Sequence, residues 1–129
     1  MAVGAPCLTK RERMVSRKLI ETLFGGSRSL TAFPIRVVYM KRERTRYDAP
    51  AQVLISVSKR RFKHAVDRNR VKRQLREAFR QNKQMLYDVL AEDEQLLMAV
   101  IWLSDEHSPS CMVETRMVAL MQRMREKLG

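Results

Sequence analysis

Apolar residues near the N-terminus recur at the spacing of one helix face. They are Leu19, Ile20, Leu23 and Phe24, and they predict a short helix in this segment. Ser16 could cap its start, and Gly25 and Gly26 would end it. A match to a capping box at Thr9 and Glu12 leaves an earlier start open.

Three segments farther along have the pattern of β-strands. Residues 34–40 and 51–58 are rich in β-branched side chains, and we expect them to pair as an antiparallel hairpin across the polar connection 41–50. Residues 29–33 either extend the first strand or form a short strand of their own. Residues 96–103 are almost continuously apolar, as in a strand that is buried on both faces.

Between these strands the chain predicts a helix with two different faces. At about 100° per residue, one side groups Val71, Leu75, Ala78, Phe79, Asn82 and Leu86. A broad face roughly opposite groups Asn69, Lys72, Arg73, Arg76, Arg80 and Lys83. Arg68 falls near the apolar stripe, where an unpaired guanidinium would be costly to bury. We therefore expect Arg68 to emerge past the sheet edge or to be held by a partner.

The C-terminal segment predicts a long amphipathic helix. Ser108 would be its N-cap and Pro109 its first residue. Its apolar positions are Val113, Met117, Leu120, Met121, Met124 and Leu128. With the preceding elements, this helix predicts one α/β domain over residues 1–129, built as helices on a small sheet, with residues 1–7 expected to be flexible.

Charge narrows the choice of partner. The chain has 26 Lys and Arg against 14 Asp and Glu, a formal charge of +12, and residues 59–83 alone hold eleven basic and two acidic residues. Such a density favours binding to nucleic acid, whose phosphates release counterions when neutralised. An anionic membrane surface is disfavoured, because the apolar stripe of the basic helix is needed for the core.

Other kinds of site find little support. Cys7 and Cys111 are too far apart to suggest a disulfide framework or a zinc site, which makes the cytoplasm the expected compartment. The acids are scattered, so a self-contained nuclease is disfavoured. His64 is better interpreted as a surface residue than as a phosphate ligand. The longest apolar run has eight residues and is too short to cross a membrane.

The segment ISVSKRRFKHAVDRNRVKRQLREAFR, residues 55–80, resembles the signature of the protein subunit of bacterial ribonuclease P. The family's Arg-Asn-Arg hallmark stands here as Arg68, Asn69 and Arg70. The order of the expected elements agrees over residues 8–128. The resemblance implies an α+β two-layer sandwich with three helices and a mostly antiparallel four-stranded sheet. It also implies a left-handed βαβ crossover, as in the second domain of ribosomal protein S5.

The resemblance also implies a function. The chain would be the non-catalytic protein component of ribonuclease P, an endoribonuclease whose RNA subunit, with Mg²⁺ bound mainly by RNA, removes 5′ leaders from precursor tRNA. Its partners would be that catalytic RNA and precursor tRNA, with no membrane. The alternative is another basic RNA-binding protein, such as a ribosomal protein.

Two sets of residues carry over from the family by position. The RNA-facing set is Lys59, Arg60, Arg61, Arg68, Asn69, Arg70, Lys72, Arg73 and Arg76. A cleft for the single-stranded leader, between the sheet and the N-terminal helix, would include Ile20, Phe24, Tyr39, Ser56 and Ser58. This chain departs from the family at Ile20, where a phenylalanine is common, and at Leu54, where a glycine is common. Its loop 59–63 also lacks the family's glycine, so we expect that loop to take a different path.

Overall fold

A computed structural model describes residues 20, 21, 23, 25, 28–43 and 50–128. Its elements are β1 (Arg28–Ala32), β2 (Ile35–Glu43), β3 (Ala51–Ser56), α2 (Ala65–Asn82), α3 (Gln84–Tyr87), β4 (Glu94–Trp102) and α4 (Ser110–Leu128). Residues 20, 21, 23 and 25 are helical. Both predicted starts of the N-terminal helix, residues 1–7 and Phe24 lie outside the described residues.

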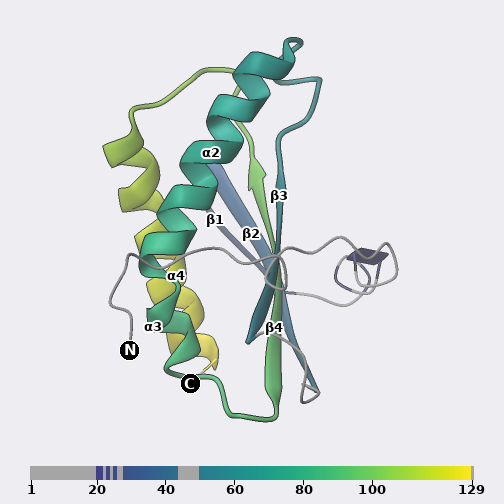
Figure 1. Ribbon diagram of the computed structural model, residues 1–129, viewed down its shortest axis with the longest axis vertical. Coiled ribbons are helices and arrows are strands. Elements are labelled where there is room, and N and C mark those ends of the chain that lie inside the picture. Colours follow the sequence, from purple (N-terminus) through teal and green to yellow (C-terminus); the bar gives the residue numbers. More distant parts are fainter. Residues whose placement is uncertain (1–19, 22, 24, 26–27, 44–49, 129) are drawn as a thin grey trace, which may run out of the picture.

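The strands form one sheet in the order β1-β2-β4-β3. β1 pairs with β2 and β2 with β4, both antiparallel, whereas β3 runs parallel to β4. Helices α2, α3 and α4 cover one face of this sheet, and residues 20, 21, 23 and 25 lie on the other side (Figure 1). The α+β fold class with a mostly antiparallel four-stranded sheet is confirmed, and β3-α2-β4 is its βαβ unit.

The predicted hairpin between residues 34–40 and 51–58 is wrong. β4 lies between the two strands and pairs with both of them. The reason is burial: Leu96, Leu97, Met98, Ala99 and Val100 are all 0% exposed. A strand this apolar is stable only at the centre of a sheet that is covered on both faces. Residues 29–33 do form a strand of their own, β1, next to β2.

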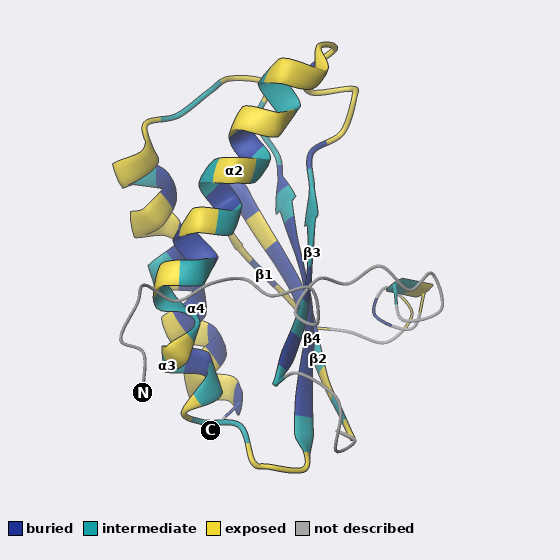
Figure 2. Ribbon diagram, in the orientation of Figure 1, coloured by how far each residue is buried: buried dark blue, intermediate teal, exposed yellow. Residues whose placement is uncertain are grey.

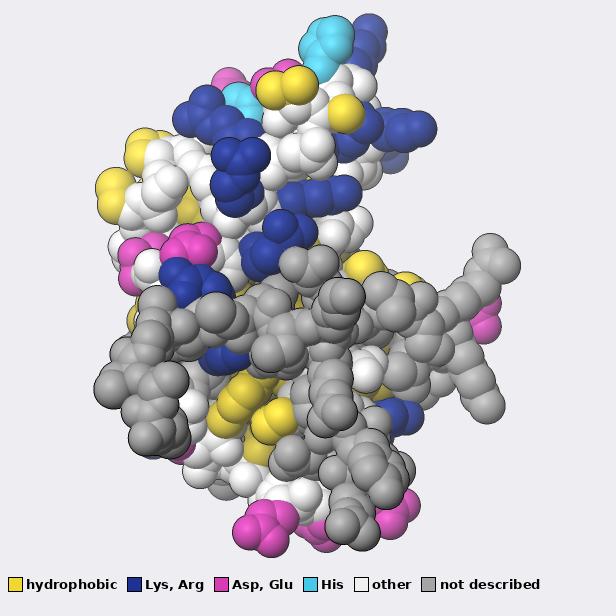
Figure 3. Space-filling view, in the orientation of Figure 1, with side chains coloured by type: hydrophobic (Ala, Val, Ile, Leu, Met, Phe, Trp, Pro, Cys, Tyr) yellow, Lys and Arg dark blue, Asp and Glu magenta, His cyan; other side chains and the backbone are white. Residues whose placement is uncertain are grey.

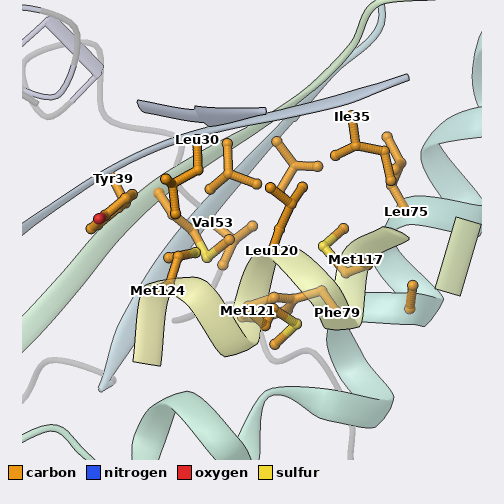
Figure 4. Packing of buried hydrophobic residues seen from close by; sticks show 14 of the residues in the cluster. Leu30, Ile35, Tyr39, Val53, Leu75, Phe79, Met117, Leu120, Met121 and Met124 are labelled. Carbon is orange, nitrogen blue, oxygen red and sulfur yellow. The ribbon is translucent and has the colours of Figure 1, made fainter. Parts of the chain in front are cut away.

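The main core lies on the face that α2 and α4 cover, which we call the first face. The apolar stripe predicted for the basic helix is buried at Val71, Leu75, Ala78 and Phe79. α4 adds Val113, Met117, Leu120, Met121, Met124 and Leu128, all predicted positions. These side chains interdigitate with alternate residues of the strands (Figure 4). Their burial is the main source of stability for this fold.

A smaller cluster lies on the opposite side of the sheet, which we call the second face. Leu23, Val38, Leu97 and Ala99 are buried there, and Ile20, Met40, Leu54 and Ile101 pack against them while partly exposed. The second face therefore has a thinner apolar cover than the first.

Two helical boundaries differ from the prediction. α4 begins at Ser110, one residue after the predicted Pro109, whose carbonyl accepts from the amides of Met112 and Val113. The basic helix ends at Asn82, and a separate short helix, α3, carries Leu86 into the core. Asn82 donates from Nδ2 to the carbonyl of Ala78 at 2.8 Å. This local hydrogen bond gives the side-chain amide a partner although Asn82 lies beside the apolar stripe.

Candidate nucleic-acid interface

The loop between β3 and α2 is anchored at both of its ends. The carbonyl of Ser58 accepts hydrogen bonds from the amides of Arg61 at 3.1 Å and Phe62 at 3.3 Å, which closes a turn. Phe62 is 8% exposed and belongs to the main core, and its ring stacks on His107 with 4.7 Å between centroids. A buried aromatic thus fixes a loop that carries the exposed cations Lys59, Arg60, Arg61 and Lys63.

Arg68 completes this anchoring. Its guanidinium Nη1 donates to the carbonyl of Phe62 at 2.8 Å and to that of Lys63 at 2.9 Å. The expectation that a partner holds Arg68 is met by the backbone of its own loop. Arg68 therefore sets the path of the chain into α2, a structural contact that the sequence did not reveal.

The first half of α2 is also tied to the connection before α4. His107 Nε2 lies 3.1 Å from Asp67 Oδ1. Two turns farther on, Gln74 Nε2 donates to the carbonyl of Ser108 at 2.9 Å and lies 3.1 Å from Ser110 Oγ. Together with the stacked Phe62, these contacts hold the helix start in a fixed position.

On this scaffold lies a surface of cations, which we call the basic surface. It consists of Lys59, Arg60, Arg61, Arg70, Lys72, Arg73 and Arg76, whose side chains make no hydrogen bond or ion pair with the described part of the chain. Lys72 and Arg76 are half-buried, and the others are exposed. The loop leads directly into α2, so the structure brings together the two parts of the predicted RNA-facing set; Asn69 is exposed among them.

The opposite end of α2 is different in charge. Arg80 donates to Glu77, and that hydrogen bond lowers the pKa of the Glu77 carboxyl below its usual value. Lys and Arg side chains gather over α2 in the space-filling view, whereas acidic side chains lie in small groups at the top, at the left and along the lower edge (Figure 3). The positive field is thus strongest around the N-terminal half of α2, where the helix dipole and free backbone N–H groups add to anion binding. The outward side of this half is exposed (Figure 2).

The predicted leader-cleft residues do not all come together. Ile20 packs on the second face, and Ser56 belongs to the same face because it alternates with Ile55 and pairs in register with Ile101. Ser58 is exposed just beyond β3. Tyr39, however, lies in the core of the first face, so its predicted place beside Ile20 is wrong. The sheet separates the two residues.

Two second-face residues that the prediction missed are Arg36 and Met40. They share a face with Val38 by the two-residue period of β2, a signal already present in the sequence. Arg36 is exposed, pairs in register with Ile101, and donates from Nε to Ser29 Oγ at 3.0 Å. Ser56, Ile101 and Arg36 therefore form a row across the sheet.

The described residues also lack two features. No group of three or more His, Cys, Asp or Glu there could hold a metal ion. Within the same ranges, no helix is long and apolar enough to span a bilayer.

Comparison with known proteins gives a consistent result. The model of the family described as ribonuclease P matches residues 8–124. A ribonuclease P protein component from Porphyromonas gingivalis is 45% identical over 100 residues, which cover 77% of this chain and 72% of that protein. One from Chlorobium phaeobacteroides is 35% identical over 109 residues, covering 78% and 75% of the two chains.

Solved structures agree in fold. The ribonuclease P protein from Thermotoga maritima superposes with a TM-score of 0.67 at 24% identity, covering 87% of this chain and 96% of that one. The protein from Staphylococcus aureus gives a TM-score of 0.66 at 18% identity, covering 88% and 94%. The arrangement of β-sheet and helices is therefore that of the proteins that the sequence matches. On the family match and the sequence identities, the chain belongs to the ribonuclease P protein family, the protein component of the enzyme that processes the 5′ ends of tRNAs.

Proposed function

We propose that this chain is the non-catalytic protein subunit of ribonuclease P and binds both the catalytic RNA and the 5′ leader of precursor tRNA. The observation that carries the proposal is the basic surface: seven cations, on the loop before α2 and on α2 itself, that have no partner among the described residues. Cations left unpaired by the protein repel each other, and a polyanion relieves that repulsion.

The basic surface would bind the catalytic RNA. Its arginines and lysines can each contact a phosphate, and the planar guanidinium groups can do so with two hydrogen bonds. Arg68 would act by holding the loop that presents Lys59, Arg60 and Arg61, because its Nη1 donates to Phe62 and Lys63 carbonyls. Asn69 would add an uncharged donor beside Arg70.

The second face would bind the leader. Its half-buried apolar residues Ile20 and Met40 offer contact to unstacked bases, while Arg36 and Ser56 offer donors to the backbone of a single strand. Tyr39 is not part of this proposed cleft, because its side chain lies on the first face of the sheet.

The chemistry would belong to the RNA subunit. Magnesium would be held mainly by RNA. The protein's own contribution would be to neutralise phosphates where two RNAs meet and to hold the leader in place. Because its substrate would be precursor tRNA, we expect the protein to act in the cytoplasm.

The test is cleavage of precursor tRNA by a bacterial ribonuclease P RNA at low Mg²⁺, with and without the protein. We expect the protein to stimulate cleavage at the 5′ end and to cleave nothing alone. Arg70→Ala with Arg73→Ala should reduce the stimulation, whereas Arg116→Ala with Arg125→Ala, an equal loss of exposed charge on α4, should not.

Three outcomes would contradict this proposal. Cleavage by the protein alone would make it a nuclease. Absence of stimulation would favour another kind of RNA-binding protein, such as a ribosomal one. Equal losses in the two double variants would mean that net charge, and not the basic surface, does the binding.

A further inference from the structure

The hydroxyl of Tyr39 is buried without a partner. Tyr39 is 2% exposed, and its Oη makes no hydrogen bond to any described residue. The ring lies at one edge of the main core, with its oxygen pointing away from the cluster (Figure 4). Buried hydroxyl groups are nearly always hydrogen-bonded in folded proteins, so an orphan of this kind needs an explanation.

The tyrosine lines a hollow between the sheet and the end of α4. This hollow has a volume of about 380 Å³, and its wall also includes Arg28, Met40, Lys41, Lys127 and Leu128. A second hollow of about 370 Å³ shares Arg28, Tyr39 and Lys127 with the first. The same three donors therefore face both spaces.

The charged side chains that line this hollow are all cationic. No Asp or Glu is among the residues that line either space, and Arg28 and Lys127 have no ion pair within the described ranges. Lys41 is different, because it contacts Glu94 Oε2 at 2.9 Å and donates to the carbonyl of Leu128 at 3.3 Å. Lys41 thus fixes the end of α4 as one wall and leaves the free cations to Arg28 and Lys127.

We infer that Arg28, Lys127 and the Tyr39 hydroxyl form a binding site for a phosphate group. A guanidinium, an ammonium and a hydroxyl are the donors that a tetrahedral oxyanion accepts from, and the ligand would satisfy the buried Oη. The hollow is larger than a bare phosphate needs, which leaves room for an attached sugar. Either an RNA backbone or a free phosphorylated small molecule could supply this group.

This site is separate from the basic surface. Arg28 begins β1 and Tyr39 pairs with it, whereas loop 59–63 follows β3, and β1 and β3 are the two opposite edges of the sheet. Tyr39 also faces away from Ile20 and the rest of the second face. Met40 is the one lining residue of the first hollow that belongs to the second face, and none of the three proposed phosphate donors does. The inference therefore does not depend on the proposed binding of RNA at those two places.

The test is a titration of the full chain with inorganic phosphate at constant ionic strength. The readout is the NMR chemical shift of the backbone amides of Arg28, Tyr39 and Lys127. We expect saturable shifts that chloride does not produce. Tyr39→Phe keeps the core ring and should weaken phosphate binding by about tenfold, as should Arg28→Gln. Arg125→Gln is the matched control, two residues from Lys127 on α4 and outside the lining of the hollow, and should leave the affinity unchanged.

Shifts that fail to saturate, that chloride reproduces, or that Tyr39→Phe and Arg28→Gln leave unaltered would overturn the inference. A second titration, with single-stranded RNA lacking a 5′ phosphate, identifies the source. Displacement of phosphate from these residues by the RNA would assign the site to a backbone phosphodiester. Retention of phosphate at these residues, with RNA bound elsewhere, would assign it to a phosphorylated small molecule.

Discussion

The two faces of the sheet differ in what covers them. On the first face, α2 and α4 bury large side chains completely, among them Phe79, Leu120 and Trp102, which are at most 1% exposed. On the second face, Ile20, Met40 and Leu54 remain partly exposed above a small buried cluster. The difference indicates that the first face holds the fold together while the second keeps apolar surface available for a partner.

A similar contrast runs along α2. At its start, Arg70 and Arg73 have no partner in the described structure, while Arg80 near its end is paired with Glu77. Charges that a fold leaves unpaired add nothing to its stability, so their concentration at one end of one helix indicates a site for a ligand. The predictions below separate side chains that stabilise the fold from those that bind RNA.

The largest expected effect comes from truncating the core of the first face. Leu120→Ala removes a fully buried side chain and should lower the free energy of unfolding by about 2–5 kcal/mol. Leu54→Ala on the half-exposed second face should lower it by about 1 kcal/mol, because less apolar area is lost. Urea denaturation measures both. Equal losses would show that the two faces contribute alike to stability.

A smaller effect should separate two neighbouring arginines. Arg68→Ala leaves the carbonyls of Phe62 and Lys63 without their donor and should lower the free energy of unfolding by about 1 kcal/mol. Arg70→Ala removes no hydrogen bond or ion pair with a described residue and should change the free energy of unfolding by less than about 0.5 kcal/mol. The same denaturation experiment decides the point. If Arg70→Ala destabilised the protein as much as Arg68→Ala, the division between holding and binding arginines would fail.

The smallest expected effect is on the loss of stability at low pH. The hydrogen bond from Lys41 lowers the pKa of Glu94 from its usual value near 4.5. A lowered folded-state pKa stabilises the fold above the ordinary pKa, and this contribution disappears as the pH falls through the lowered value. We expect Glu94→Gln to reduce the difference in stability between pH 7 and pH 3, measured by urea denaturation. Glu114→Gln, an exposed carboxylate on α4, is the control, and an equal reduction there would contradict the assignment.

Local patterns predicted the elements well, but not their pairing. The helical spacing of Val71, Leu75 and Phe79 and the continuous apolar run of β4 each reflect burial of that segment alone. The position of β4 between β2 and β3 depends on contacts between segments that are distant in sequence. The usual expectation that consecutive strands pair with each other therefore failed for β2 and β3.

The candidate site was predictable in the same uneven way. The basic surface follows from a run of charges at helical spacing. The partner of Arg68 did not follow, because it is a loop backbone held down by the buried Phe62. Tyr39 was placed on the wrong face because its position was taken from relatives, although alternation along β2 groups it with Ile35 and Val37.

The central claim is that RNA binds the basic surface through its phosphates. The most direct test is the affinity of the protein for ribonuclease P RNA at several salt concentrations, comparing the wild type with Arg70→Ala and Arg73→Ala combined. We predict that the slope of log affinity against log salt falls in magnitude by about 2, about one for each lost phosphate contact. The control pair Arg116→Ala and Arg125→Ala should keep the wild-type slope. An unchanged slope in the α2 variant, or an equal fall in the control, would contradict the account.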